Sequence, residues 1–166
     1  MPPPDSALKS QVLAYLKNHH VVTLATHGPQ GLWAAAVFYA SDGLNLYFLS
    51  SPGSRHSMNI AANARIAATI QEDYKAWPDI KGIQLEGEAV RLEGAARATA
   101  LACYGAKFPL IGNLAQAPLE IAKAMSKVAW YKLVPEAMHF IDNAQGFGHR
   151  ESLPCDLIPP PFPSSV

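Results

Sequence analysis

The chain has 166 residues, with 13 basic and 13 acidic side chains and a formal net charge of zero. Hydrophobic residues make up 49% of the sequence and charged residues 16%, which is typical of a folded globular domain and excludes a disordered chain. A balanced charge without any basic run disfavours nucleic acid or an anionic membrane surface as a partner.

Cysteine and histidine usage narrows the chemistry further. Cys103 and Cys155 are too few for a disulfide framework, and no histidine or acidic spacing is typical of a metal site, so no protein-built metal centre is expected. No apolar run is long enough to cross a bilayer, and the N-terminus lacks the basic start and apolar segment of a signal peptide. We therefore expect a cytoplasmic protein without a membrane partner.

The first third of the chain predicts a helix followed by an antiparallel meander. Apolar residues recur at helical spacing over residues 5–18. Strand-like runs follow at 21–26, 32–40 and 44–50, and Ser41-Asp42-Gly43 is a strong hairpin signal between the last two. Short turns between strands indicate antiparallel pairing.

The middle of the chain alternates helix and strand. We predict a helix near residues 55–63, a strand at 65–71, a long loop at 72–80 and a strand at 83–92. That last strand alternates clearly, and Gly87 in its middle predicts a bend or bulge of the kind that small barrels need at corners.

The last third predicts an alanine-rich helix at 95–107, then loop and a short helix over 108–127. Two final strands are expected at 129–134 and 137–142, with Pro135 between them. The proline-rich tail, residues 154–166, is expected to be either disordered or an extended arm on a neighbour.

These elements predict an α+β, mainly β fold in one domain, residues 1–153, followed by the tail. We expect a closed or nearly closed antiparallel barrel of about six to seven strands with about two to three peripheral helices, because closure removes exposed sheet edges.

Polar residues gather where the third strand passes into a helix. Ser50, Ser51, Ser54, Arg55 and His56 surround the predicted first turn, whose free backbone N–H groups and partial positive charge suit an anion. An arginine can grip a phosphate through two parallel hydrogen bonds. The same residues are also ordinary turn chemistry, in which Ser54 is only a helix cap and Arg55 a solvated charge.

Five segments together resemble the pyridoxamine-phosphate-oxidase-like, FMN-binding split barrels, and particularly a small bacterial branch of that superfamily. They are VVTLAT (21–26), GLWAAAVFYASDG (31–43), LNLYFLSSPGSRHSMNIAANARIAATI (44–70), GIQLEGEAVRLEG (82–94) and WYKLVPEAMHFIDNAQGFGH (130–149). Their order and spacing carry the resemblance, which covers residues 8–150.

The resemblance implies an antiparallel split barrel that forms a homodimer, with FMN bound between the subunits. It implies that the flavin phosphate sits at Ser50, Ser54, Arg55 and His56, with the isoalloxazine along the backbone of the second strand. The complete set of cofactor-binding residues expected in this way is Ala35, Ala36, Val37, Phe38, Ser50, Ser51, Ser54, Arg55, His56 and Gln84.

The chain departs from the oxidase itself at several positions. His56 stands where the oxidase has lysine, alanines replace its basic residues on the second strand, and Lys81-Gly82 replaces its Arg-Gln pair. The resemblance therefore argues against strict pyridoxamine-phosphate oxidase activity.

The function expected is that of an FMN-dependent oxidoreductase of unknown substrate, in which the flavin carries the chemistry and no catalytic side chain is identified. One alternative is a protein that binds or senses flavin without catalysis. Another is a split barrel that binds haem or a deazaflavin, and haem would need an axial ligand such as His56, His139 or His149.

Several other side chains have two interpretations. Trp33 and Trp130 are expected in a core or interface rather than against a flavin. The segment of Phe147, His149 and Arg150 either reaches over a partner's flavin or is a plain surface loop. Lys81 and Lys107 are expected to be solvated charges.

Overall fold

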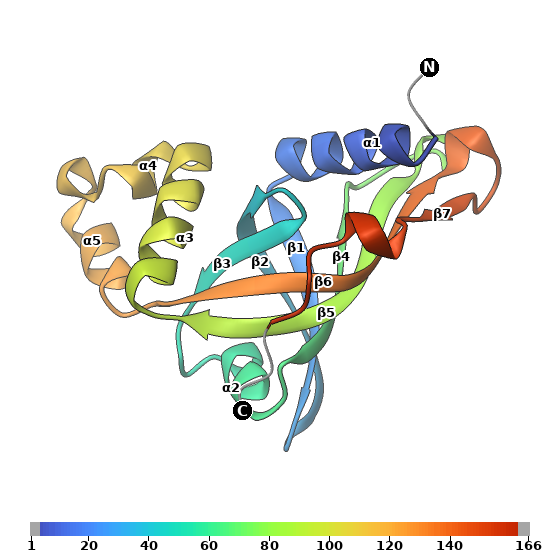
Figure 1. Ribbon diagram of the computed structural model, residues 1–166. Coiled ribbons are helices and arrows are strands. Elements are labelled where there is room, and N and C mark those ends of the chain that lie inside the picture. The colour runs from blue at the N-terminus through green and yellow to red at the C-terminus, as the bar shows by residue number, and fades with distance from the viewer. Residues whose placement is uncertain (1–3, 163–166) are drawn as a thin grey trace.

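The structure is a computed structural model that describes the backbone of residues 4–162 and the side chains of residues 6–162. Seven strands form one antiparallel sheet (Figure 1). They are β1 (Val21–Gly28), β2 (Gly31–Asp42), β3 (Asn45–Ser50), β4 (Arg65–Gln71), β5 (Lys81–Leu92), β6 (Ala129–Asp142) and β7 (Arg150–Ser152).

The sheet closes on itself and confirms the predicted split barrel. Its strand order is β3-β2-β1-β4-β5-β6-β7, and an additional pairing of β3 with β6 closes the first six strands into a ring. β7 extends beyond the ring by pairing with β6 from His139 to Ile141. Closure leaves few free edges, which is how small β domains avoid edge-to-edge association.

Two hydrophobic clusters hold the domain together. The barrel interior contains completely buried aliphatic side chains from most strands, among them Leu24, Leu46, Ile70, Ile83 and Leu133. A second cluster lies outside the barrel wall. It consists of Ala40, Tyr47, Leu92, Ala100, Tyr104, Met125 and Trp130. The position of Trp130 confirms the expectation of a core aromatic.

Gly87 of β5 lies opposite a bulge in β6, whose extra residue is Glu136, so the irregularity occurs at the predicted glycine but in the partner strand. The pairing of β5 with β6 shifts register between Glu86 and Gly87. A Cβ at Gly87 would meet the Val134 carbonyl oxygen at 2.1 Å and Pro135 Cα at 2.8 Å, so only glycine allows this approach of the two backbones.

The prediction of two final strands separated at Pro135 is wrong. β6 runs unbroken for 14 residues from Ala129 to Asp142. Pro135 is tolerated because it lies at the bulge itself, next to the unpaired Glu136, and bulges are among the few places where a strand accommodates proline.

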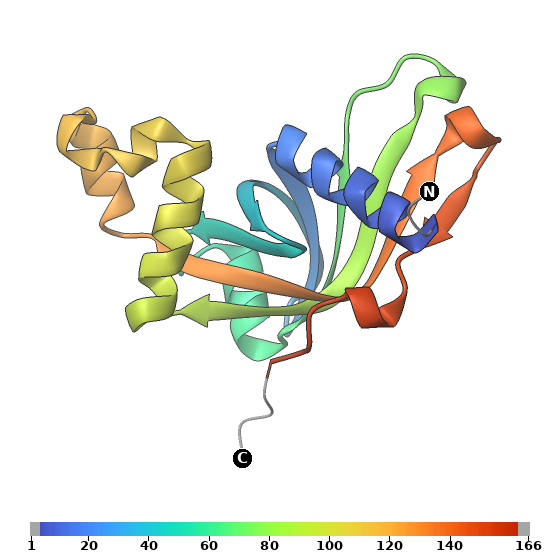
Figure 2. The same ribbon diagram turned by 45° about the horizontal axis from the view of Figure 1, so that its top comes forward.

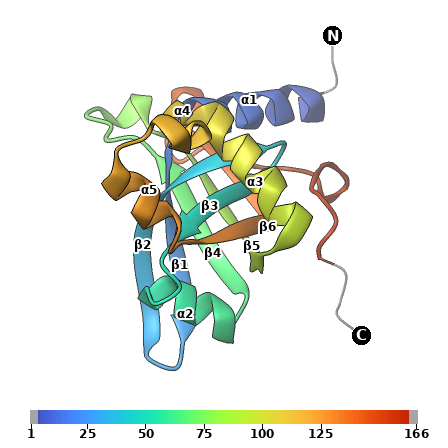
Figure 3. The same cartoon turned by 90° about the vertical axis from the view of Figure 1, so that its left-hand side faces the viewer.

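The helices exceed the two or three expected. The described residues contain α1 (Pro4–Asn18), α2 (Arg55–Ala62), α3 (Gly94–Lys107), α4 (Pro109–Gly112) and α5 (Leu119–Met125). Helix α1 lies across one end of the barrel, whereas α3, α4 and α5 form a lobe at its side (Figure 2). Helix α2 lies near the opposite end, beside the β1–β2 hairpin (Figure 3). Short four- and seven-residue helices such as α4 and α5 give too few turns for periodicity to reveal.

The described part of the tail is ordered on its own barrel. Residues Cys155–Leu157 form a 3₁₀ turn, Ile158 packs against the barrel core, and Lys132 lies 5.8 Å from the ring of Phe162. Up to Phe162 the tail contacts its own chain, whereas an arm that lies on a neighbour stays a prediction; residues 163–166 lie outside the described residues. Among the helices described for residues 4–162, none has the length and hydropathy needed to span a membrane.

Candidate functional site

Ser54 organises the junction between β3 and α2. Its backbone is extended, with φ −67° and ψ 149°, and its Oγ accepts a hydrogen bond from the Ser57 amide at 3.3 Å, so it is the N-cap of α2. The Ser54 hydroxyl in turn donates to Ser57 Oγ at 2.9 Å. The capping role expected for Ser54 is thus present, and its hydroxyl also belongs to a larger polar cluster.

His56 joins the serines in this cluster. Its Nε2 lies 2.6 Å from Ser50 Oγ and 3.2 Å from Ser54 Oγ, while the two serine oxygens are 3.1 Å apart. Burial lowers the pKa of His56, because desolvation disfavours the imidazolium form. The imidazole is therefore neutral near pH 7, and we name Ser50, Ser54, His56 and Ser57 the hydroxyl–imidazole cluster.

Arg55 faces the β1–β2 hairpin instead of this cluster. Its Nη2 donates to the carbonyls of Gln30 at 2.6 Å and Leu32 at 3.3 Å, and its guanidinium lies 4.6 Å from the centroid of the Trp33 ring. The buried Nε of Arg55 has no hydrogen-bond partner among the described residues. The guanidinium is therefore held at the hairpin through Nη2 while its buried Nε has no partner, and the expectation of a simply solvated charge is not met.

An unpaired strand edge lies beside this arrangement. On one edge, β2 pairs with β1 from Gly31 to Phe38. On the other edge, it pairs with β3 only from Tyr39 to Asp42. Among the described residues, the other edge of residues 31–38 therefore has no strand partner. This gap is the split of the barrel.

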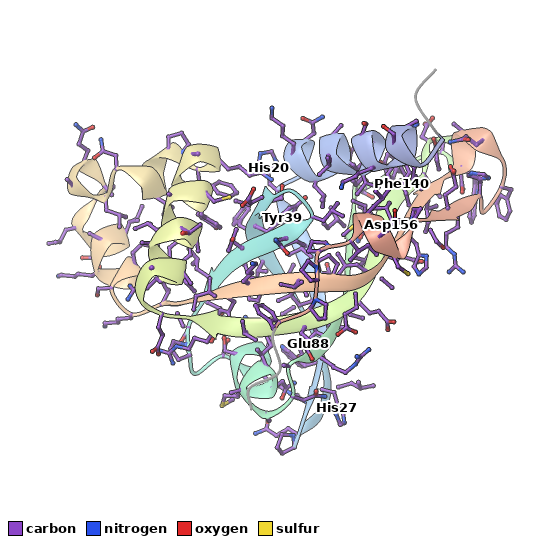
Figure 4. The ribbon with its side chains drawn as sticks, viewed as in Figure 1. His20, His27, Tyr39, Glu88, Phe140 and Asp156 are labelled. Carbon is purple, nitrogen blue, oxygen red and sulfur yellow. The ribbon has the colours of Figure 1, made fainter. Side chains whose placement is uncertain are left out.

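The backbone groups at this edge can be assigned from two hydrogen bonds. The Tyr39 amide donates to the His20 carbonyl on the β1 side, whereas the Leu32 carbonyl accepts from Arg55 on the free side. Because backbone groups alternate between the two edges of an antiparallel strand, those of Leu32, Ala34 and Ala36 face the split. In Figure 4, His20 and Tyr39 mark the end of the barrel near α1, and His27 marks the far end at the hairpin.

The outer face of β1 and β2 is exposed and mostly apolar, and Ala67 of β4 lies beside it. Cross-strand pairing places small side chains side by side at its centre, with Ala34 opposite Ala25 and Ala25 opposite Ala67. Larger apolar side chains surround them. These are Val21, Leu32 and Phe38, which are 42%, 79% and 58% exposed. Contiguous apolar surface of this kind is uncommon on a monomer.

The remaining expected residues occupy different places. Ala36 and Phe38 lie on the outer face, whereas Ala35 and Val37 point toward the barrel side, and Val37 packs against its core. Ser51 shapes the turn, since its Oγ accepts from the Gly53 amide at 3.4 Å. Gln84 is exposed on β5 and separated from β2 by β1 and β4, so a single chain does not bring it to the cluster.

Two sizeable cavities lie away from the hydroxyl–imidazole cluster. One of about 730 Å³ lies between α3 and α4, and one of about 480 Å³ lies between α1, the β2–β3 turn and α3. None of Ser50, Ser54, Arg55 and His56 lines either cavity.

Lys107 borders the second cavity and is not the solvated charge that the sequence predicts. Its Nζ donates to the carbonyls of Leu16 at 3.2 Å and of His19, and lies 4.3 Å from the centroid of the Tyr39 ring. Burial lowers its pKa to about 8. Lys107 thus ties α3 to the end of α1. By contrast, Lys81 is partly exposed and pairs with Asp142 at 3.5 Å.

The structure adds participants that the sequence pattern did not single out. The Ser57 hydroxyl, the Trp33 ring beneath Arg55 and the carbonyls of Gln30 and Leu32 all contact the expected residues. Only Ser57 carried a usable signal, because it is a polar residue three positions after the N-cap. Every residue has a backbone carbonyl, so the sequence does not show which carbonyls accept a hydrogen bond from Arg55.

The fold is shared with known proteins. The chain superposes on the heme binding protein from Mycobacterium smegmatis with a TM-score of 0.70 and 21% identity, covering 95% of this chain and 61% of that one. It superposes on a putative pyridoxamine 5'-phosphate oxidase from Listeria innocua with a TM-score of 0.59 and 20% identity, covering 79% and 95%. Likeness at this level of identity establishes the fold alone.

Sequence relationships are more specific. The chain is 33% identical over 138 residues to the UPF0306 protein of Enterobacter sp. (strain 638), which covers 82% of this chain and 89% of that protein. The UPF0306 protein YhbP of Salmonella paratyphi A is also 33% identical over 138 residues, covering 82% and 86%. Residues 8–142 match the sequence profile of the family described as pyridoxamine 5'-phosphate oxidase. The chain therefore belongs to the pyridoxamine 5'-phosphate oxidase-like split-barrel family.

Proposed function

We propose that this protein is an FMN-binding flavoprotein that acts as a flavin-dependent oxidoreductase. The observation that carries the proposal is the free edge of β2 beside the hydroxyl–imidazole cluster, because the two features match the two ends of FMN. Membership of the pyridoxamine 5'-phosphate oxidase-like family supports the same ligand.

The hydroxyl–imidazole cluster fits a phosphate. Ser50 and Ser54 offer hydroxyls, His56 offers a ring nitrogen, and the start of α2 offers backbone N–H groups with partial positive charge. Arg55 follows the N-cap directly and retains a buried, unpartnered Nε. These donors would hold the phosphate of the flavin.

The free edge of β2 fits the ring. The isoalloxazine carries hydrogen-bond donors and acceptors along one side, and the edge offers unpaired N–H and C=O groups from Ala34 and Ala36. The small alanine side chains permit a flat ring to approach this backbone closely.

When bound, the flavin supplies hydride or electron transfer at its ring. The chain's part is to bind the phosphate, orient the ring against β2 and limit access of water to it. Oxidation of pyridoxamine 5'-phosphate is not included in the proposal, because β2 carries alanines and His56 replaces the lysine expected of such an oxidase.

We further propose that two copies pair through the outer face of β1, β2 and β4. Exposed Val21 and Phe38 with the flat alanine centre give an apolar surface without charge at its middle, and burial of such surface drives association. The free edge of β2 borders this face, so a second copy would cover the ring site from outside. A partner's Gln84 or Phe147 could then reach a flavin that its own chain does not.

The cofactor is tested by the visible spectrum of the purified protein and by FMN added to it. A flavin spectrum with one FMN per chain is the expected result, and a colourless protein that takes up no added FMN would contradict the proposal. Bleaching of the bound flavin by NADH or NADPH would separate an oxidoreductase from a flavin carrier or sensor.

Pairing is tested by the variant Ala67→Arg, which places a charge on the outer face away from the β2 edge. Light scattering should give a dimer for the parent protein and a monomer for the variant. The control is Ala76→Arg in the exposed loop before β5, which should leave the dimer intact. A parent protein that is monomeric would refute the proposal that two copies pair through this face.

Haem is the second candidate ligand, favoured by one specific observation. The half-buried His139 on β6 has its Nδ1 fixed 2.8 Å from Ser152 Oγ, which leaves Nε2 for an axial bond. A protein of the same fold is described as heme binding. A Soret band in place of a flavin spectrum, lost in His139→Ala, would select this candidate.

A further inference from the structure

The proposed phosphate site has an unusual charge balance. It is formed by hydroxyls and by His56, whose imidazole is half-buried and neutral near pH 7, while the Arg55 guanidinium is bound to hairpin carbonyls. A phosphate monoester brings about two negative charges near neutral pH. The unpartnered Nε of Arg55 lets that guanidinium offset about one of these charges. The other is costly to remove from water without a further cation, so a second positive charge has to be supplied when the phosphate binds.

We propose that His56 supplies this charge by taking up a proton when a phosphate monoester binds, so that binding of the ligand is coupled to proton uptake and tightens as the pH falls. The inference rests on the proposed function, because it concerns the phosphate end of the same site. It assigns His56 a role that a lysine at this position would not have, since lysine keeps its charge in the absence of ligand.

The hydrogen bonds of the cluster show which ring nitrogen faces the phosphate site. Nε2 contacts Ser50 and Ser54, whereas no hydrogen bond in the described part of the chain engages Nδ1. The imidazolium form carries hydrogen on both nitrogens, so protonation makes Nε2 a donor directed into the cluster whichever nitrogen holds the hydrogen in the neutral ring.

Nε2 is already directed into the cluster that would hold the phosphate, since it lies 2.6 Å from Ser50 Oγ. Protonation therefore supplies a charged donor at this position without moving the ring. A charge-assisted hydrogen bond is shorter and stronger than a neutral one.

Other charged groups do not substitute for His56. The elements packed against α2 are β1, β2 and β5. Their titratable or charged side chains are His27 on β1, Tyr39 and Asp42 on β2, and Lys81, Glu86, Glu88 and Arg91 on β5. None of the hydrogen bonds or ion pairs found between residues 6 and 162 joins one of these groups to the imidazole, and burial is the cause of its lowered pKa. Arg91 lines a cavity of about 320 Å³ together with Ser57, but no hydrogen bond or ion pair in the described residues joins Arg91 to His56.

Linkage sets the size of the effect. If one proton is taken up for each ligand, affinity changes up to about tenfold per pH unit between the His56 pKa of the free protein and that of the complex. Phosphate monoesters have a second pKa of about 6, so their own titration has to be separated from that of the protein.

The test measures binding of FMN and of riboflavin, which lacks the phosphate, by calorimetry at about pH 6.5 and about pH 8. FMN should bind the parent protein roughly tenfold more tightly at the lower pH and with uptake of about one proton, whereas riboflavin should show neither effect. His56→Lys should bind FMN tightly at both pH values. His56→Gln should bind it weakly at both, with an unchanged circular dichroism spectrum.

Equal FMN affinity and equal pH dependence in the parent protein and His56→Gln would overturn the inference while leaving the proposed function intact. Absence of FMN binding in both the parent and His56→Lys would refute the proposed function instead. In that case the imidazole pKa of His56, measured by NMR in sulfate and in chloride, decides the inference. Sulfate stays a dianion over this range, so a higher pKa in sulfate supports proton-linked anion binding and an equal pKa overturns it.

Discussion

Adding one methyl group at Gly87 tests how the barrel closes. In Gly87→Ala the new Cβ would lie 2.1 Å from the Val134 carbonyl oxygen and 2.8 Å from Pro135 Cα. Both are backbone atoms of β6, so no side-chain rotation relieves the overlap. Either β6 moves away from β5 at the bulge or the variant does not reach the native state.

The magnitude follows from the kind of contact. Overpacking of a dense interior typically costs about 1–3 kcal/mol and occasionally more. Because the overlap involves backbone in the longest pair of strands, we expect about 3 kcal/mol or more of lost stability. For a chain of this size, each kcal/mol lowers Tm by roughly 2–4 °C, so the expected decrease is roughly 6–12 °C.

Thermal unfolding followed by circular dichroism is the appropriate assay, with Gly53→Ala as the matched control. A Cβ at Gly53 would meet only Ser51 Oγ at 3.9 Å, which is ordinary contact. The control should therefore keep the parent Tm or raise it slightly, since alanine restricts the unfolded chain. If Gly87→Ala unfolds at the same temperature as Gly53→Ala, the assignment of Gly87 to a backbone contact at the bulge is incorrect.

Three further predictions concern single side chains. Arg55→Ala should strip FMN from the purified protein and Arg55→Lys should restore part of the binding; full flavin retention in Arg55→Ala would exclude a role in phosphate binding. Tyr39→Phe removes the buried 2.8 Å hydrogen bond to the Leu16 carbonyl and should lower the free energy of unfolding, measured in urea, by about 1 kcal/mol. An unchanged urea midpoint would show that this hydrogen bond does not stabilise the fold. Because the folded state lowers the pKa of Lys107 to about 8, unfolded chains bind more protons between that value and the pKa of a free lysine. The stability of the parent relative to Lys107→Met should therefore rise with pH across this window, and a fall would show that the ammonium form is favoured by folding.

Local patterns predicted many of the elements because they reflect the side chains' own periodicity. The alternation of residues 83–89 reappears as the buried and exposed sides of β5, and the mid-strand glycine lies opposite a bulge in β6. The same reasoning failed at Pro135, because whether a proline interrupts a strand depends on the partner strand. At a bulge the regular ladder is already interrupted, so proline is accommodated and β6 continues.

Burial of charged groups was the second point that local patterns missed. Lys107 looks like a solvated charge at the end of an amphipathic helix. Its actual environment comes from α1, about ninety positions earlier, whose last carbonyls need donors. Such a contact is set by how two helices lie on the barrel and has no counterpart in neighbouring residues.

The sequence by itself determined the strand-rich α+β class, the meander of β1, β2 and β3, and the gathering of Ser50, Ser54, Arg55 and His56 at a helix start. These depend on periodicity and on side chains within a few positions of one another. Only the tertiary structure decided that Arg55 faces the hairpin, that His56 lies half-buried among hydroxyls, and that β2 keeps a free edge at the split. Each of these depends on where the barrel closes, and closure is a property of strands that meet only in the folded chain.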